Sequence, residues 1–147
     1  MAGIDNTYSR LFAGMRTSST GLAAERMRID VIARNIANAN STSTPEGGPY
    51  RRRTVSFSPL MQKDDQGKPQ VTGVSVTEVG QDHVTPFEVI HDPSHPDADA
   101  DGNVSLPNVN ATKEMADLIT AMRSYDANLR AQQSLMRMAE RALELAR

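Results

Sequence analysis

The sequence contains no cysteine and no tryptophan, and aromatic residues make up only 4% of its 147 residues. Without cysteine the chain can form no disulfide and offers no thiolate ligand to a metal. A compact domain of this length usually fills its core with more large aromatic rings. The scarcity of rings therefore favours elongated helices, or a subunit whose core is completed by its neighbours.

The sequence also lacks a strong charge of either sign. Its formal net charge is −2, whereas proteins that bind nucleic acid normally carry clustered lysine and arginine. The first ten residues show neither the basic start nor the apolar stretch of a secretory signal peptide, and no run approaches the length of a membrane span. We therefore expect no nucleic-acid partner and no cleaved signal peptide.

Apolar residues spaced seven apart predict a long helix over residues 6–40. This spacing keeps one seam on one face of a slightly underwound helix. Asp5 or Asn6 is expected to cap the start, and the asparagines at 38–40 are expected to end the helix, because asparagine tolerates the left-handed conformation. The seam residues are Tyr8, Met15, Leu22, Ile29 and Ile36.

A second set of apolar residues predicts another helix over residues 111–147, with Asn110 as its cap. The residues spaced seven apart are Met115, Met122, Leu129, Met136 and Leu143. Most of the positions three residues after these are also apolar and form a second row of the seam: Leu118, Tyr125, Ala139 and Ala146. At about 1.5 Å per residue, each helix would reach roughly 50 Å.

One such stripe is equally typical of an ordinary helical bundle, but two at opposite ends of a chain favour pairing of the termini. We predict that residues 6–38 and 111–146 pair as an antiparallel coiled coil. Polar residues such as Ser18 and Glu25 flank the first seam. We therefore expect neighbouring subunits to complete the helical core.

The middle of the chain, residues 41–109, has a different character. All eight prolines lie between Pro45 and Pro107, which excludes long helices there. Short alternating runs and glycines predict strands at 54–57, 71–79 and 83–89, and turns at Gly67 and Gly73. The predicted fold is mainly α with a small β-rich insert. Residues 1–40 and 110–147 form the helical core, and residues 41–109 form the insert.

One acidic segment resembles a calcium loop. The run from Asp97 to Gly102 places carboxylates at alternate positions before a glycine, as at the start of an EF-hand. The twelfth position is Asn108 instead of a bidentate glutamate, and nearby prolines exclude the flanking helices. We expect a solvated turn without metal, with a calcium-dependent binding module as the one small-ligand alternative. A turn without metal is also expected for His91, Asp92 and His95.

Arg51, Arg52 and Arg53 form a short basic run at the start of a predicted strand. Such runs usually belong to solvated faces, and contact with an acidic neighbour is the open alternative. The sequence shows no recognisable nucleophile–base arrangement and no glycine-rich phosphate loop. We therefore expect neither catalysis nor a cofactor nor a small-molecule substrate.

Several segments resemble the flagellar rod and hook proteins. The N-terminal signature of that family is similar to Gly21–Arg26, Val31–Ala33 and the asparagine-rich helix end, whose motif residues are Asn35, Ile36, Ala37 and Asn38. The segments Thr44–Arg52, His95–Gly102 and Leu106–Asn110 resemble subunits of the proximal rod in particular. The segment Arg123–Asn128 is similar to the closing helix of the family. Arg34 departs from the pattern, since family members commonly carry serine there. Asn35 and Asn38 lie on one face and are expected to satisfy late carbonyls or an adjacent helix.

The resemblance implies a structural subunit of the bacterial flagellar basal-body rod, the helical drive shaft that transmits motor torque. Its implied partners are copies of itself, other rod proteins, the surrounding basal-body rings and, transiently, the type III export apparatus. The implied location is the periplasm-spanning rod, reached without a cleaved signal. Open helical filaments form when identical subunits join through surfaces that are not self-complementary.

Two further expectations concern the chain outside such an assembly. The functional alternative is a cytoplasmic coiled-coil adaptor or export chaperone, which should not need the proline-rich insert. For an isolated monomer we predict that both terminal zones are largely disordered, because a lone helix of this kind is marginal in water.

Overall fold

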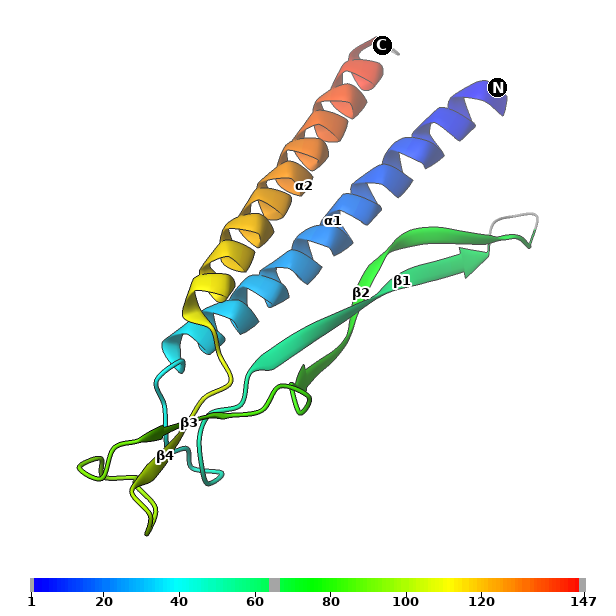
Figure 1. The fold of residues 1–147 in the computed structure, drawn as a ribbon. Coiled ribbons are helices and arrows are strands. Elements are labelled where there is room, and N and C mark those ends of the chain that lie inside the picture. Colours follow the sequence, from blue (N-terminus) through cyan, green and yellow to red (C-terminus); the bar gives the residue numbers. More distant parts are fainter. Residues whose placement is uncertain (1, 64–66, 146–147) are drawn as a thin grey trace. The chain divides into compact units, whose positions relative to one another are not determined.

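Two long helices flank four strands along the chain (Figure 1). The computed structural model describes residues 2–63 and 67–145, with side chains described for residues 12–63 and 67–144. The elements are α1 (Ala2–Ala37), β1 (Arg53–Lys63), β2 (Pro69–Gln81), β3 (Glu88–His91), β4 (Asn103–Leu106) and α2 (Ala111–Leu145). The predicted fold class, mainly α with a small β-rich insert, is confirmed at this level. The side chain of Tyr8 and residue Ala146 lie outside the described residues.

The helix ends follow capping chemistry. Asn110 caps α2 as predicted, since its side-chain oxygen accepts a hydrogen bond from the Lys113 N–H at 3.0 Å. At the end of α1, the Asn38 side chain donates to the carbonyl of Arg34 at 2.8 Å, as expected for a late carbonyl. The left-handed conformation expected at residues 38–40 is wrong, because no described residue other than glycine has a positive φ. The predicted start of this helix at residue 6 is wrong: α1 begins at Ala2, because no proline interrupts the preceding residues. Neither of the described helices is both long and apolar enough to cross a membrane.

The strands form two small sheets, β1 with β2 and β3 with β4. β3 and β4 pair antiparallel, with Val89 opposite Ser105 and Ile90 opposite Val104. The predicted strand at 83–89 overlaps β3 only at residues 88 and 89. The Asp82 carboxylate accepts hydrogen bonds from the backbone N–H groups of Val84 and Thr85 and bends the preceding segment into a turn.

The two predicted glycine turns have different outcomes. Gly67 adopts a φ of +77°, a left-handed conformation in which glycine is favoured, as a turn requires. Gly73 instead lies inside β2. A Cβ at this position would collide with Thr20 Oγ1 on α1, so the glycine permits a close approach of strand to helix.

The chain divides into two compact units, which we name the terminal unit and the central unit. The terminal unit comprises residues 1–28, 57–77 and 121–147, and the central unit comprises residues 29–56 and 78–120. Both helices contribute to both units. Each unit is described by itself below.

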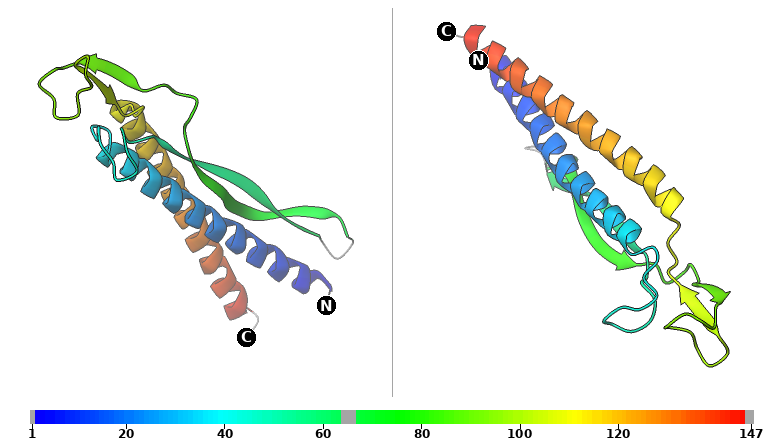
Figure 2. Two further views of the ribbon diagram at one scale, coloured as in Figure 1. Left: turned by 90° about the horizontal axis from the view of Figure 1, so that it is seen from below. Right: turned by 90° about the vertical axis from the view of Figure 1, so that its left-hand side faces the viewer.

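In the terminal unit, α1 lies against both β2 and α2. Thr17 Oγ1 donates to the Thr72 carbonyl at 3.1 Å, and Thr20 Oγ1 accepts from the Val74 N–H at 3.1 Å. A Cβ added at Gly14 would lie 3.2 Å from Leu135 Cδ1, and one at Gly21 would lie 3.2 Å from Asn128 Nδ2. The glycines therefore allow α2 to approach α1 closely. Figure 2 shows the two helices from two further directions.

The central unit has both an apolar and a polar core. Its buried apolar residues include Val31 and Ile32 near the end of α1 and Val104 in β4. Three polar residues are also buried: Asn35, Asn108 and Glu114. Buried polar groups need partners, and these partners define the candidate site.

Candidate functional site

Asn35 lies at the centre of a buried polar junction in the central unit, with 1% of its surface exposed. Its Nδ2 donates to the Arg53 carbonyl and to Glu114 Oε2, both at 2.9 Å. Its Oδ1 accepts from the Arg53 N–H at 2.9 Å and from the Tyr50 hydroxyl at 3.0 Å. Both amide hydrogens and both oxygen lone pairs are therefore used. One side chain ties the end of α1 to the start of β1 and to the first turns of α2.

Glu114 brings a buried negative charge into the junction, since it is 1% exposed. Its Oε1 accepts from Arg52 Nε at 2.7 Å, while its Oε2 accepts from Asn35. Arg52 also places Nη1 4.0 Å from Asp82 Oδ2. A buried carboxylate is tolerated only when it is paired and hydrogen-bonded. The guanidinium and the amide meet both requirements here.

Asn108 connects the junction to the turn after β2. Its Oδ1 accepts from the Arg52 N–H at 2.7 Å, and its Nδ2 donates to the carbonyls of Asp82 and Thr85, each at 3.0 Å. Hydrogen bonds to the Asp82 carboxylate, first of all from the Thr85 backbone N–H, hold its pKa below the usual range. Five separate segments of the chain thus meet around three buried polar side chains.

Tyr50 closes the junction on its outer side. Burial raises the pKa of the Tyr50 phenol, against the lowering effect of Arg53 and Arg34. The phenol is therefore protonated at neutral pH and able to donate its hydrogen to Asn35 Oδ1.

The three consecutive arginines have three different environments. Arg52 points to Glu114 and Asp82 inside the junction. Arg51 stacks over the ring of Phe87, with its guanidinium carbon 4.2 Å from the ring centroid, and donates to the Asp82 carbonyl. No side chain among the described residues forms an ion pair with Arg53 or accepts a hydrogen bond from its guanidinium. All three arginines are partly buried. Arg52 is the one whose guanidinium enters the junction, while the Arg51 and Arg53 guanidinium groups lie outside it.

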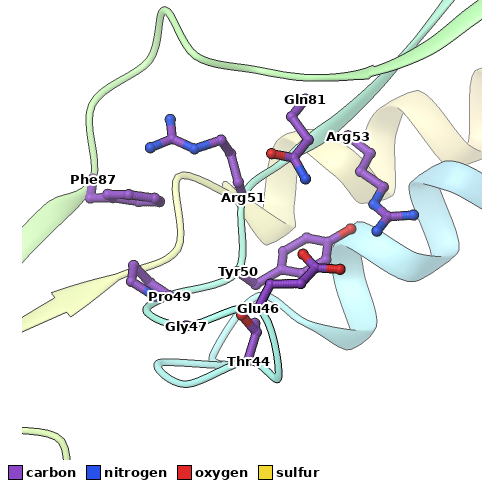
Figure 3. A pocket seen from close by; sticks show the side chains of 9 residues that line it. All are labelled: Thr44, Glu46, Gly47, Pro49, Tyr50, Arg51, Arg53, Gln81 and Phe87. Carbon is purple, nitrogen blue, oxygen red and sulfur yellow. The ribbon is translucent and has the colours of Figure 1, made fainter.

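Arg51 and Arg53 line a cavity of about 270 Å³ beside the junction (Figure 3). The loop residues Thr44 and Glu46 form another part of its wall, and Gln81 lies between the two arginine side chains. We call this cavity the basic pocket. Two guanidinium groups and one carboxylate leave it with an excess of positive charge.

Two of the three carboxylates in the acidic turn predicted at 97–102 are used within the subunit, one of them by the backbone of the turn itself. Asp99 Oδ1 accepts from the N–H groups of Asp101 and Asn103 at 2.9 and 2.8 Å. Asp97 Oδ2 accepts from the Thr42 hydroxyl at 2.7 Å. Within the described residues, no group of three or more His, Asp or Glu side chains is placed to hold a metal ion.

Residues near the acidic turn behave in the same way. Asp92 accepts from the hydroxyl and the N–H of Ser94, the hydroxyl first of all, and these bonds hold the pKa of Asp92 below its usual range. His91 Nδ1 lies 3.2 Å from Asn103 Oδ1, and His95 Nδ1 accepts from the Asp97 N–H at 3.1 Å. Each side chain thus has a local structural partner.

The predicted seam residues differ between the two helices. On α1, partial burial is found at Met15, Leu22, Ile29 and Ile36. On α2, Leu118 and Tyr125 are partly buried, but the residues of the main seam are exposed by 36–60%: Met115, Met122, Leu129, Met136 and Leu143. The residues of α2 that lie against the glycines of α1 are Asn128 and Leu135. Each is displaced by one position, or about 100° around the helix, from the predicted seam.

Sequence reasoning found Asn35 but missed its partner Glu114 and the other junction residues Arg52 and Asn108. Glu114 immediately precedes the apolar seam residue Met115. A charged residue at that position is usually interpreted as part of the solvent-exposed face of the helix. The available signal was the combination of an asparagine at a helix end with an arginine run some fifteen residues later. Nothing in the spacing alone connects either to residue 114.

Comparisons with known proteins identify relatives of this architecture. A family model described as "Flagella basal body rod protein" matches residues 15–43, and one described as "Flagellar basal body rod FlgEFG protein C-terminal" matches residues 100–145. The flagellar basal-body rod protein FlgC of Borreliella burgdorferi is 43% identical over 80% of this chain and 86% of its own. The FlgC of Bacillus subtilis is 36% identical over 92% of this chain and 98% of its own. The FlgC of Salmonella typhimurium is 36% identical over 87% of this chain and 92% of its own.

Proposed function

The chain belongs to the FlgC family of flagellar basal-body rod proteins, and we propose that it builds the proximal part of the rod, with its two helices forming the axial core. It is a structural subunit and not an enzyme, since its relatives are named as rod proteins. The alternative of a cytoplasmic adaptor or export chaperone has no support from these relatives. The finer assignments are proposals that rest on the features below.

The helical core is proposed to be an antiparallel coiled coil within each subunit. Two contacts of the terminal unit support this arrangement. Leu135 lies beside Gly14 and Asn128 beside Gly21, so that a step of seven residues forward on α1 matches a step of seven residues backward on α2. A spacing of seven residues on both helices is the repeat of a left-handed coiled coil.

Neighbouring rod subunits are proposed to complete this core. The supporting observation is an apolar stripe on the part of α2 in the terminal unit, which we call the outer stripe. It consists of Met122, Leu129, Met136 and Leu143, which are 53%, 36%, 45% and 60% exposed. A row of large apolar side chains with regular spacing is typical of a surface that packs against another helix. The outer stripe would pack against helices of adjacent rod subunits, and this observation carries the proposal.

Substitution of the outer stripe tests this role. Leu129→Asp, and separately Met122→Asp, should strongly reduce the number of assembled basal bodies and abolish motility, because a carboxylate would be buried without a partner in the packed rod. The matched controls are Arg130→Asp and Arg123→Asp, which place the same charge at exposed positions next to the stripe. Recovery of each variant in the periplasm, in a strain that lacks the native chain, separates failed assembly from failed export. Normal rods with Leu129→Asp and Met122→Asp would contradict the proposal.

The chain is further proposed to reach the rod through the flagellar export apparatus without a cleaved signal, and to lie within the basal-body rings. Family membership supports the location in the basal body. Intact-mass spectrometry of the subunit from purified basal bodies tests whether its N-terminus is cleaved during export. The expected mass is that of a chain with an uncut N-terminus, apart from removal of the initiator methionine. A mass that lacks further N-terminal residues would contradict uncleaved export.

A further inference from the structure

The basic pocket has the chemistry of a receptor for a carboxylate. Arg53 brings a guanidinium that no described side chain pairs with, and Arg51 is held in place by Phe87 and by its bond to the Asp82 carbonyl. A guanidinium presents five N–H donors in a planar fork that matches the two oxygens of a carboxylate. Because Arg51 is already ordered, little conformational entropy remains to be lost on binding.

The acidic turn of the same unit presents one suitable carboxylate. Asp97 and Asp99 are used by Thr42 and by the backbone of the turn. The Asp101 carboxylate has no partner among the described residues, and Asp101 is exposed. It is therefore the carboxylate in this turn that is available to another molecule.

The acidic turn is also rigid. Gly102 has a φ of +73° and is buried, and a Cβ there would lie 2.9 Å from Pro93 Cγ and 3.0 Å from His91 Cε1. The Asp92 N–H donates to the Gly102 carbonyl at 2.9 Å, and the Asp99 N–H donates to the Asn103 carbonyl at 2.9 Å. Asp101 is thus presented from a turn that does not need to be ordered on contact.

The pocket and the turn belong to one unit but do not pair with each other within it, since no ion pair joins Asp101 to either arginine. In the right-hand view of Figure 2, the cyan loop that includes residues 44–49 and the yellow-green turn leave the central unit in different directions. Such a pair of unlike surfaces on one subunit gives a head-to-tail contact, which propagates along an open assembly. Subunits set side by side in one orientation can bring the turn of one to the pocket of the next.

We propose that the basic pocket of one subunit binds the Asp101 carboxylate of a neighbouring copy of this chain through the guanidinium group of Arg53, with Arg51 adding positive charge to the pocket wall. This inference rests on the proposed function, because it requires copies of the chain to be neighbours in the rod. It gives a role to the Arg53 guanidinium, which has no partner among the described residues, while Arg52 is committed to the junction. Its main contribution is to the register of adjacent subunits, since exposed charge pairs fix partner and orientation more than affinity.

Chemical cross-linking tests the contact in assembled rods. The chain has no native cysteine, so introduced cysteines are the sole thiols of this subunit. An Arg53→Cys and Asp101→Cys double variant would replace the native chain in cells, and purified basal bodies would be treated with a short bis-maleimide. A direct disulfide is unsuitable, because an arginine–aspartate pair holds its Cα atoms beyond the roughly 7 Å that a disulfide tolerates. We expect dimers and longer multimers of this chain from the double variant and none from either single variant.

The matched control pairs Asp101→Cys with Val84→Cys, a central-unit position that is 94% exposed and lies outside the pocket. Multimers formed equally well by this control, or cross-links from Asp101→Cys to a different rod protein, would overturn the inference. So would basal bodies that contain the double variant without any cross-link. Recovery of the unmodified chain in basal bodies tests the proposed function separately, so the two failures are distinguishable.

Charge reversal gives a second test that does not depend on cross-linker geometry. Arg53→Asp and Asp101→Arg should each lower the yield of assembled basal bodies several-fold, while the double variant should recover at least half of the lost yield. The hydrogen bonds of residue 53 to Asn35 use its backbone only, so the substitutions spare the buried junction. A double variant no better than the worse single variant would contradict the contact.

Discussion

The two units of this subunit bury very different groups. Among the described residues, the terminal unit buries Ala24, Ala121 and Gly73, while large apolar side chains such as Phe12, Met61 and Leu143 are 63%, 55% and 60% exposed. The central unit buries branched apolar residues together with Asn35, Asn108 and Glu114, and each buried polar group has partners. The comparison indicates that the central unit buries more of a core of its own than the terminal unit does, which supports the proposal that neighbouring subunits cover the terminal unit.

The largest expected effect is a loss of stability of the central unit. Glu114→Ala removes the partner of Arg52 and of one Asn35 amide hydrogen. Breaking one side of a buried pair costs about 3–5 kcal/mol, a large share of the stability of a small domain. Urea denaturation followed by circular dichroism measures the loss, with Glu144→Ala at an exposed position of α2 as the control. Equal midpoints for the two variants would show that the junction is not what stabilises this unit.

Hydrogen exchange on the isolated monomer sharpens the comparison. Amides at 15–28 and 122–143 should exchange at least about 100-fold faster than those at 103–106 and 114–118, a difference of about 2.7 kcal/mol in opening free energy. The reason is that the terminal unit buries too little surface to offset the entropy of ordering two long helix segments. Strong protection across both terminal segments at micromolar concentration would instead show a preformed coiled coil.

Asn35→Asp tests the junction by a nearly isosteric change. The new oxygen would replace an amide nitrogen that lies 2.9 Å from both Glu114 Oε2 and the Arg53 carbonyl. Two hydrogen bonds are lost and two carboxylates face each other, so we expect a loss of about 1–3 kcal/mol. Asn40→Asp makes the same chemical change at an exposed position. The idea fails if both variants unfold at the same urea concentration.

Gly73→Ala makes a comparable test in the terminal unit. The added Cβ would meet Thr20 Oγ1 and would lie 3.1 Å from Thr20 Cγ2, and overpacking of this kind costs about 1–3 kcal/mol. Gly80→Ala in the same strand is the control, since its nearest contact would be an ordinary 3.4 Å. Thr20→Ala should reduce the penalty of Gly73→Ala, and a double-mutant cycle measures the coupling. Additive effects would show that the strand and the helix do not meet in solution.

The smallest expected effect is on how the stability of the central unit depends on pH. The pKa of Asp82 is lowered in the folded state, so its stabilising contribution is present above the ordinary aspartate pKa of about 4 and is lost as the pH falls through the lower folded value. Asp82→Asn should therefore make the stability of the central unit less dependent on pH between about 4 and 2. Asp126→Asn, at an exposed position of α2, is the control. Identical pH profiles for both variants would argue against the role of Asp82.

Regular spacing allowed the helices to be predicted, because a repeat of seven residues is a local property of the chain. It did not reveal which residues of α2 lie against α1. Two rows of residues with the same spacing of seven run side by side on α2, one through Asn128 and one through Leu129. Their directions around the helix axis differ by only about 100°, and apolar content alone favours the row through Leu129. The observed approach uses glycine on α1, which allows close contact, and leaves the longer side chains on the outside.

The polar junction was less accessible to prediction because its members are far apart in sequence. Asn35 and Glu114 are separated by 79 positions, and no periodicity links them. β4 was missed for a similar reason: four residues next to an acidic turn carry little strand signal until Val104 pairs with Ile90. Asn110 and Asn38 were predicted correctly because capping depends only on nearby backbone groups.

The saturated amide of Asn35 has a mechanical consequence for a part of a rotating shaft. Every polar position of this side chain is occupied, and its partners come from the loop before β1, from the first residue of β1 and from α2. A twist of the end of α1 about its own axis would therefore strain all four bonds together, and none can be exchanged for another without breaking its neighbours. Hydrogen bonds weaken steeply with distance and angle. The joint should resist small torsion stiffly and yield abruptly, whereas apolar contacts of the kind that the α2 face offers do not depend on direction in this way.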